Sequence, residues 1–104
     1  MALGVLAGTW ALTSCASGSA TPSDPTLAKG KEVYDANCVG CHGPTGGGGA
    51  GPRLIGVADR LSVDQEVATI TNGVEGTAMP AWGERLSPEE IAAVAAYTRS
   101  LSAG

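Results

Sequence analysis

The feature that most constrains this chain is the run Cys38-Val39-Gly40-Cys41-His42. In a C-x-x-C-H sequence, each of the two thiols can form a thioether bond to the same porphyrin, and the next residue places an imidazole beside the iron. The motif therefore predicts a covalently attached c-type haem. Cys38 and Cys41 are the expected attachment points, and His42 is the expected proximal ligand of the iron.

Three other uses of the cysteine pair fit the sequence less well. A zinc site needs further ligands, and the chain has no other C-x-x-C pair and no second histidine. A thioredoxin-like redox pair needs a βαβ context, and no segment alternates with the period of two that is typical of a strand. A disulfide between Cys38 and Cys41 would close a very short loop and leave Cys15 as an odd thiol.

The composition also favours a cofactor in the core. Apolar residues make up 43% of the 104 residues, but aromatic residues only 4%, and there is no phenylalanine. A single domain of this size usually needs a metal, a staple or another large apolar body to complete its core. The formal charge of −4 argues against a nucleic-acid partner and favours protein partners with a positively charged docking surface.

Residues 1–14 carry no charged side chain and lead directly into Cys15. The run is too short to span a bilayer and fits the apolar region of a secretory signal peptide. Leu12-Thr13-Ser14-Cys15 resembles a bacterial lipobox, whose cysteine is acylated, although the basic residue that usually opens a signal is missing. An ordinary cleaved signal and an uncleaved anchor are the alternatives. All three predict export to the periplasm or another extracytoplasmic space.

Residues 15–25 are small, polar and proline-containing, which predicts a flexible tether between the signal and a domain at residues 26–104. A leader without function is the alternative. The tether would let the domain move while an acylated Cys15 keeps it at the outer face of a membrane.

A first helix is predicted from Thr26, as its N-cap, to about Asn37. Its inner face is formed by residues spaced by three and four, namely Leu27, Gly30, Val33, Tyr34 and Asn37. Gly30 costs roughly 1 kcal/mol relative to alanine inside a helix. Close approach of another helix would offset this cost, and a tolerated surface glycine is the alternative.

Two further helices begin at capping boxes, in which a serine and a residue three positions later cap each other's backbone. Ser62 and Gln65 open a helix that ends at Asn72-Gly73, and Ser87 and Glu90 open the last helix. Their expected inner faces are Val63, Val67 and Ile70 in the first, and Ile91, Val94, Ala95, Thr98 and Leu101 in the second. The four glycines at 46–49 predict a mobile surface loop. The chain is therefore predicted to be all-α.

A bound haem needs its sixth iron position filled or deliberately open. His42 is the only histidine, which excludes bis-histidine ligation within the chain, and Met79 is the only methionine beyond the initiator. Pro80 restricts the backbone around Met79, which lies in an irregular segment. A thioether is a soft ligand that raises the reduction potential of a histidine-ligated haem. We expect Met79 to ligate the iron, with packing as a core filler as the alternative.

From Thr26 to Leu101 the chain resembles a small bacterial monohaem class I cytochrome c, in a lipoprotein form. The resemblance implies an all-α cytochrome c fold of three to four helices around one covalently bound haem. It also implies a role for each residue that matches a family position. These are a helix crossing of Gly30 with Tyr97, an aromatic at Tyr34, a carbonyl of Pro52 that accepts the imidazole N–H, porphyrin packing by Leu54, and shielding of a haem edge or binding of a propionate by Trp82.

The resemblance implies an electron carrier, not an enzyme. Its single haem iron would cycle between Fe(II) and Fe(III) with both axial positions held by the protein. Redox proteins are the expected partners, including a membrane oxidase or reductase complex, and a monomer is expected. The alternatives are an open-site haem protein, such as a ligand sensor or peroxidase-like protein, and a fixed cytochrome subunit of a larger oxidase or dehydrogenase.

Overall fold

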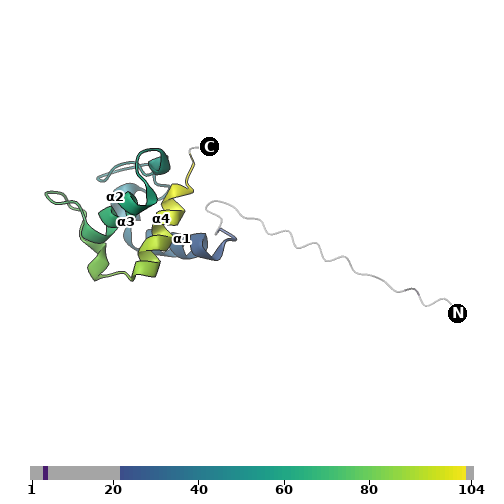
Figure 1. The fold of residues 1–104 in the computed structure, drawn as a ribbon. Coiled ribbons are helices and arrows are strands. Elements are labelled where there is room, and N and C mark those ends of the chain that lie inside the picture. Colours follow the sequence, from purple (N-terminus) through teal and green to yellow (C-terminus); the bar gives the residue numbers. More distant parts are fainter. Residues whose placement is uncertain (1–3, 5–21, 103–104) are drawn as a thin grey trace.

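A computed structural model describes residue 4 and residues 22–102 (Figure 1). Apart from residue 4, the predicted signal lies outside the described residues, as do Cys15 and most of the predicted tether. Within them, the chain forms four α-helices and two short 3₁₀-helices and no strand, in the order α1 (Pro25–Asn37), α2 (Val39–His42), η1 (Val57–Asp59), α3 (Val63–Asn72), η2 (Trp82–Glu84) and α4 (Pro88–Arg99). The all-α prediction is confirmed. None of these helices is long and apolar enough to cross a membrane.

Helix α1 begins at Pro25, with Asp24 as its N-cap. The carboxylate of Asp24 accepts hydrogen bonds from the backbone N–H groups of Thr26, at 2.8 Å, and Leu27, at 3.1 Å. The prediction of Thr26 as the cap is therefore wrong. Proline suits the first helical position because its φ angle is already helical and it has no N–H to leave unpaired, so the acidic residue before it becomes the cap.

Helices α3 and α4 begin at the predicted capping boxes. The N–H of Gln65 donates to Oγ of Ser62 at 3.1 Å, and the N–H of Ser62 donates to the Gln65 side chain at 2.8 Å. Ser87 and Glu90 make the same reciprocal pair at 3.1 and 3.0 Å. These hydrogen bonds lower the pKa of the Glu90 carboxyl, because they favour its charged form.

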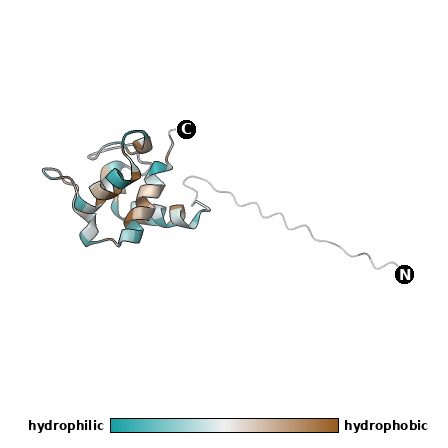
Figure 2. Cartoon of the chain, viewed as in Figure 1, coloured by the Kyte–Doolittle hydropathy of each residue, from teal (hydrophilic) through white to brown (hydrophobic). Residues whose placement is uncertain are grey.

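The inner face of α3 differs from the prediction. Val63, in the first turn, is 49% exposed, whereas Glu66 is only 4% exposed. Glu66 and Ile70 are one helical turn apart, and both line the interior between α3 and α4. On the inner face of α4, the predicted Ile91, Val94, Ala95 and Thr98 are buried. Leu101, which was also predicted on this face, lies beyond the end of α4 at Arg99 and is half-buried. Figure 2 shows that both helices carry apolar and polar residues.

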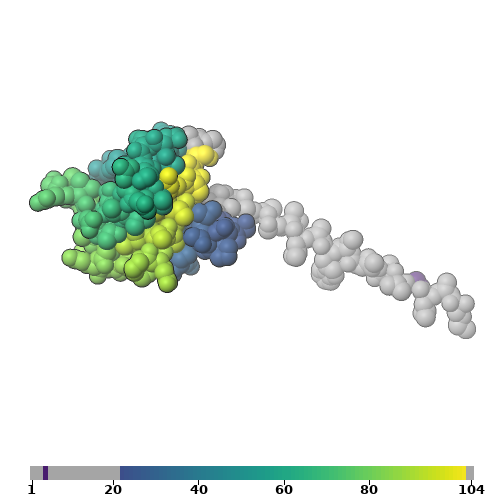
Figure 3. All heavy atoms as spheres, in the orientation of Figure 1, coloured from purple at the N-terminus to yellow at the C-terminus, as the bar shows by residue number. Residues whose placement is uncertain are grey.

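Helices α1 and α4 pack against each other, and α4 lies between α1 and the segments around α3 (Figure 3). Gly30 is buried at this crossing, where an added Cβ would lie 2.1 Å from the carbonyl oxygen of Ala93 and 2.6 Å from Cβ of Tyr97. The rings of Tyr34 and Tyr97 pack beside it with centroids 5.5 Å apart. Gly30 is therefore required by the backbone of α4 and is not a surface glycine.

The glycine run is irregular, as predicted, and hydrogen bonds anchor its backbone. The carbonyl oxygen of Gly46 accepts hydrogen bonds from the N–H groups of Leu54, at 2.8 Å, and Ile55, at 3.1 Å. The N–H of Gly48 donates to the carbonyl oxygen of His42 at 2.8 Å. Gly46 is buried and has φ of 76°, a left-handed conformation that glycine adopts without strain.

Candidate haem site

A cavity of about 450 Å³ lies between α2, α3, α4 and the loops that connect them. This volume is in the range of pockets that hold a small ligand or cofactor. The cavity brings together residues that are far apart in the sequence and that the motif and the resemblance had singled out. Those in its wall are Cys38, Cys41, His42, Pro52, Leu54, Met79 and Trp82.

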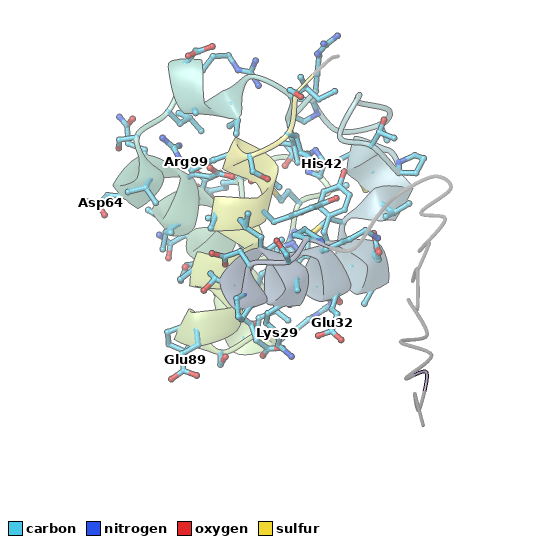
Figure 4. All side chains as sticks on the ribbon, turned by 90° about the vertical axis from the view of Figure 1, so that its right-hand side faces the viewer. Lys29, Glu32, His42, Asp64, Glu89 and Arg99 are labelled. Carbon is cyan, nitrogen blue, oxygen red and sulfur yellow. The ribbon has the colours of Figure 1, made fainter. Side chains whose placement is uncertain are left out.

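His42 is held by the loop that follows it. Its Nδ1 lies 2.8 Å from the carbonyl oxygen of Pro52, so this nitrogen donates a hydrogen bond when it carries the proton. In that tautomer Nε2 keeps a free lone pair, which is the form that binds a metal. His42 is 8% exposed, and its side chain points into the body of the domain (Figure 4).

The loop backbone is shaped to fit this imidazole. The N–H of Gly51 donates to the carbonyl oxygen of Cys41 at 2.8 Å, which brings the loop back against α2. A Cβ on Gly51 would lie 2.9 Å from Cε1 and 3.1 Å from Nδ1 of His42. Any larger residue at position 51 would therefore press on the ring.

Both cysteines of the motif are free thiols in this structure, with Cys38 partly buried and Cys41 exposed. Burial raises the pKa of the Cys38 thiol to about 11, with a smaller contribution from the charge of Cys41. A redox-active C-x-x-C pair has a thiol whose pKa is lowered. The shift has the opposite direction here, so Cys38 is not activated as a redox thiolate.

Met79 reaches the cavity from the loop after α3. This loop closes on itself through two hydrogen bonds. The N–H of Val74 donates to the carbonyl oxygen of Met79 at 3.3 Å, and the hydroxyl of Thr77 donates to the carbonyl oxygen of Val74 at 2.7 Å. Gly73 ends α3 with φ of 70°, and a Cβ there would lie 2.8 Å from the Met79 carbonyl oxygen. Met79 is half-buried, with its position set by backbone contacts on both sides.

Trp82 and Leu54 complete the predicted part of the cavity wall. Trp82 begins η2 and is half-buried, and the Arg85 guanidinium lies 5.5 Å from the centroid of its ring. This distance is within the range of a cation–π contact. Leu54 is half-buried and packs against the core cluster that contains Val94.

The other predicted residues do not line the cavity but support the elements that do. Tyr34 is fully buried, and its hydroxyl donates to the carbonyl oxygen of Gly43 at 2.5 Å, which ties α1 to the end of α2. Gly30 and Tyr97 form the crossing of α1 with α4 described above. The structure therefore brings one group of predicted residues into the cavity and places these three behind it.

Several residues of the cavity wall were not recognised as site residues in the sequence. They include Glu66, Thr98, Ile70 and Val94, which come from α3 and α4, and Arg60, which follows η1. Thr98 and Val94 lie on the predicted inner face of α4, so the helical spacing of the sequence already indicated that they are buried. The burial of Glu66 had no such signal, because a carboxylate between apolar positions of an amphipathic helix normally faces solvent.

The residues present fit a c-type haem. Two thiols, an imidazole with a free nitrogen and a thioether all line one cavity, whose other wall residues include Leu54, Val57, Ile70 and Val94. In the described part of the chain, no three residues among His, Cys, Asp and Glu gather into a separate metal site. Cys38 and Cys41 would hold the porphyrin covalently, while His42 and Met79 would bind its iron.

The comparison with protein families agrees with this site. Residues 25–97 match the model of the family described as Cytochrome C oxidase, cbb3-type, subunit III. The chain is 41% identical over 97 residues to the Cbb3-type cytochrome c oxidase subunit FixP of Azorhizobium caulinodans, covering 85% of this chain and 31% of FixP. It thus spans about a third of the length of this relative.

A smaller cytochrome matches over nearly its whole length. Cytochrome c6 of Chlorolobion braunii is 37% identical over 86 residues, which are 75% of this chain and 93% of that protein. Among solved structures, cytochrome cL from Hyphomicrobium denitrificans aligns with a TM-score of 0.65 and 30% identity, over 74% of this chain and 48% of that one. The resemblance to a small monohaem cytochrome c is thereby confirmed. The chain belongs to the family described as Cytochrome C oxidase, cbb3-type, subunit III, and its described residues form a cytochrome c domain.

Proposed function

We propose that this domain is a one-haem electron carrier in which His42 and Met79 bind the two axial positions of the iron. As a cytochrome c domain, the chain binds haem c covalently. A haem held here supplies a reversible one-electron couple at its iron. The observation that carries the proposal is that Cys38, Cys41, His42 and Met79, which are the only candidates for attachment and ligation in the described residues, line one cavity.

The chain's own residues tune and protect this couple. Pro52 fixes the tautomer and orientation of His42 through its carbonyl oxygen and increases the basicity of the imidazole. The apolar wall around Leu54 and Val94 excludes water, and Trp82 shields the cavity between α3 and α4. With both axial positions held by side chains, no substrate reaches the metal, so the domain transfers electrons without being an enzyme.

We further propose that the mature protein is an exported lipoprotein that is attached through an acylated Cys15 to the outer face of a membrane. The support is the uncharged run before Cys15 and the lipobox-like sequence that includes it. The acidic net charge of −4 favours encounter with basic redox partners, and added salt should slow that encounter. The domain acts as a monomer in this proposal.

A fixed role in an oxidase complex is the second candidate. It is supported by the match to FixP and to the Cbb3-type cytochrome c oxidase subunit CcoP of Azospirillum, which is 37% identical over 91 residues. This candidate predicts the same haem chemistry but stable co-purification with a membrane oxidase. A carrier should instead separate from every membrane complex when Cys15 is replaced.

The proposal is tested by optical spectra of the exported protein in both oxidation states, by carbon monoxide binding, and by mass spectrometry. A carrier with His42 and Met79 ligation should show one covalent haem, a reversible one-electron couple and no rapid binding of carbon monoxide to the ferrous state. Stoichiometric carbon monoxide binding would show an open iron site and favour a sensor or peroxidase-like protein instead.

A further inference from the structure

Glu66 is the buried carboxylate of the described domain. It is 4% exposed and lies on α3, in the wall of the haem cavity. Asp64, on the same helix, projects outward, whereas Arg99 of α4 reaches into the interior (Figure 4). An ionised carboxylate is expensive to bury unless hydrogen bonds and charges compensate. Its partners therefore decide what it can do.

Arg99 is a weak counter-ion for Glu66. Its Nη1 lies 3.4 Å from Oε1 of Glu66, which is long for a charge-assisted hydrogen bond, and 2.7 Å from the carbonyl oxygen of Leu61. The guanidinium thus has a strong acceptor whether or not Glu66 is charged. The Arg99 side chain is 23% exposed, so water approaches the pair from this side.

Thr98 can pair with Glu66 in both protonation states. Its hydroxyl hydrogen-bonds to Oε2 of Glu66 and also lies 3.0 Å from the carbonyl oxygen of Ala95. A hydroxyl donates one hydrogen bond and accepts others. When Glu66 is ionised, Thr98 donates to it. When Glu66 is protonated, Glu66 donates to Thr98 and Thr98 donates to Ala95, so no buried polar atom is left unpaired.

The other ionisable groups that face the cavity are not available to gain and lose a proton. Arg53 and Arg60 stay charged over the physiological range, and Arg60 is held by the carbonyl oxygens of Arg53, at 2.6 Å, and Ile55, at 3.4 Å. Cys38, Cys41 and His42 are committed to the haem in the proposed function. Within the described part of the chain, Glu66 is thus the ionisable wall residue that is free to exchange a proton.

We propose that Glu66 couples proton transfer to electron transfer at this haem, releasing a proton when the haem is oxidised and taking one up when it is reduced. The inference rests on the electron-transfer function proposed above. An ionised carboxylate in a low-dielectric wall stabilises the ferric state, which has one more positive charge. By reciprocity, the ferric state favours the ionised carboxylate. On oxidation one electron passes to the redox partner and one proton passes from Glu66 to water, and reduction returns both.

The test is the midpoint potential of the holoprotein, measured between about pH 4 and pH 9. The wild-type potential should fall as the pH rises, because loss of the Glu66 proton favours the ferric state. The limiting slope is about 59 mV per pH unit, which is a tenfold change in a one-electron equilibrium constant. Glu66→Gln should abolish this slope. Asp64→Asn removes an exposed carboxylate from the same helix and should leave it unchanged.

Each other outcome is decisive. A flat wild-type profile, or a slope that persists in Glu66→Gln and so belongs to another group such as a haem propionate, overturns the inference. A wild-type protein without a reversible haem couple refutes the proposed function instead. If Glu66→Gln does not fold, infrared difference spectra between the two redox states decide. A protonated-carboxyl band that disappears on oxidation and shifts in Thr98→Val supports the inference, and absence of such a band overturns it.

Discussion

Nδ1 of His42 and the carbonyl oxygen of Pro52 are 2.8 Å apart, although nine residues, six of them glycine, separate the two in the sequence. The loop reaches this position through backbone hydrogen bonds to Cys41 and His42 themselves. Its role is therefore to return the backbone to the imidazole. The glycines at 49 and 51 permit the close approach, because a Cβ at either position would lie 2.9 Å from an atom of Cys41 or His42.

Gly51→Ala tests this relationship. The added methyl group would lie 2.9 Å from Cε1 of His42, so either the ring or the loop must move. We expect a loss of about 1–3 kcal/mol of stability, the usual cost of overpacking, together with an altered haem spectrum. Denaturant unfolding of the holoprotein, followed by its optical spectrum, measures both.

Gly47→Ala is the matched control, because its Cβ would have only Thr45 Oγ1 within 4 Å, at 3.7 Å. It should change neither stability nor spectrum by more than the usual surface effect of about 0.5 kcal/mol. Equal stability and equal spectra of the two variants would mean that a methyl group at residue 51 does not press on the imidazole.

Gly30→Ala should destabilise the domain although alanine is the better helix former. The methyl group would lie 2.1 Å from the Ala93 carbonyl oxygen, which belongs to the backbone of α4 and cannot rotate away. The helices must separate, and we expect a net loss of about 1–3 kcal/mol or more. Thermal unfolding measures the loss.

Gly40→Ala is the control for Gly30→Ala, since nothing lies within 4 Å of the added methyl group in α2. It should leave stability unchanged or raise it by up to about 1 kcal/mol, through a less flexible unfolded chain. A Gly30→Ala protein as stable as Gly40→Ala would contradict the close crossing of α1 and α4.

Much of the fold could be predicted from local sequence signals. The capping boxes at Ser62 and Ser87 determine their helix starts through neighbouring backbone groups alone, so the residues carry the whole signal. The N-cap of α1 was misplaced because Thr26 also resembles a cap. The Asp24-Pro25 pair carried the better signal, since proline at the first position leaves the preceding residue as the cap.

The site could be predicted only where a residue type is tied to one chemistry. The cysteines and His42 follow from their spacing, and Met79 follows from being the only methionine beyond the initiator. Glu66 and the anchored glycine loop could not be predicted, because both depend on partners distant in sequence. The partners of Glu66 are Thr98 and Arg99 on α4, and Gly46 is paired with Leu54 and Ile55.

The burial of Tyr34 leads us to expect a loss of folding stability at alkaline pH. Burial raises the pKa of this phenol to about 12 from its ordinary value of about 10. Between these two values the unfolded state loses the phenol proton while the folded state keeps it, so folding stability falls as the pH rises from 10 to 12. Below pH 10 both states are protonated, and the full stability is present. Urea unfolding at pH 9, 10 and 11 measures the slope.

Tyr34→Phe should lose the part of this slope that comes from the phenol, because it has no proton to release. It should also be less stable at neutral pH by about 0.5–1.5 kcal/mol, since the hydrogen bond to the Gly43 carbonyl oxygen is lost. A slope that is identical in the two proteins would assign the alkaline transition to another group.

Cys15→Ser tests the proposed anchor. The wild-type mature protein should begin at Cys15, carry a mass increment equal to its acyl chains and sediment with membranes. Cys15→Ser should lose the increment and the membrane attachment, whereas Ser14→Ala, which keeps the cysteine, should retain both. Intact-mass spectrometry of fractionated cells gives the answer, and an unmodified wild-type N-terminus would rule out the lipoprotein form.

Met79→Ala tests the sixth ligand while leaving Cys38, Cys41 and His42 in place. Covalent haem should be retained, because both thiols remain. The absorption band of methionine-to-iron ligation should disappear, the midpoint potential should fall, and the ferrous protein should now bind carbon monoxide. Optical spectra and a redox titration measure these changes, and an unchanged spectrum would mean that the thioether only packs in the cavity wall.

Met79→His separates the identity of the ligand from the mere filling of the position. An imidazole at residue 79 should restore a six-coordinate spectrum without carbon monoxide binding, but the potential should stay below that of the wild type, because the soft thioether is what raises it. The loop closure through Val74 and Thr77 involves only the Met79 backbone, so both variants keep it. If Met79→His recovered the wild-type potential, the loop and not the sulfur ligand would set the potential of this site.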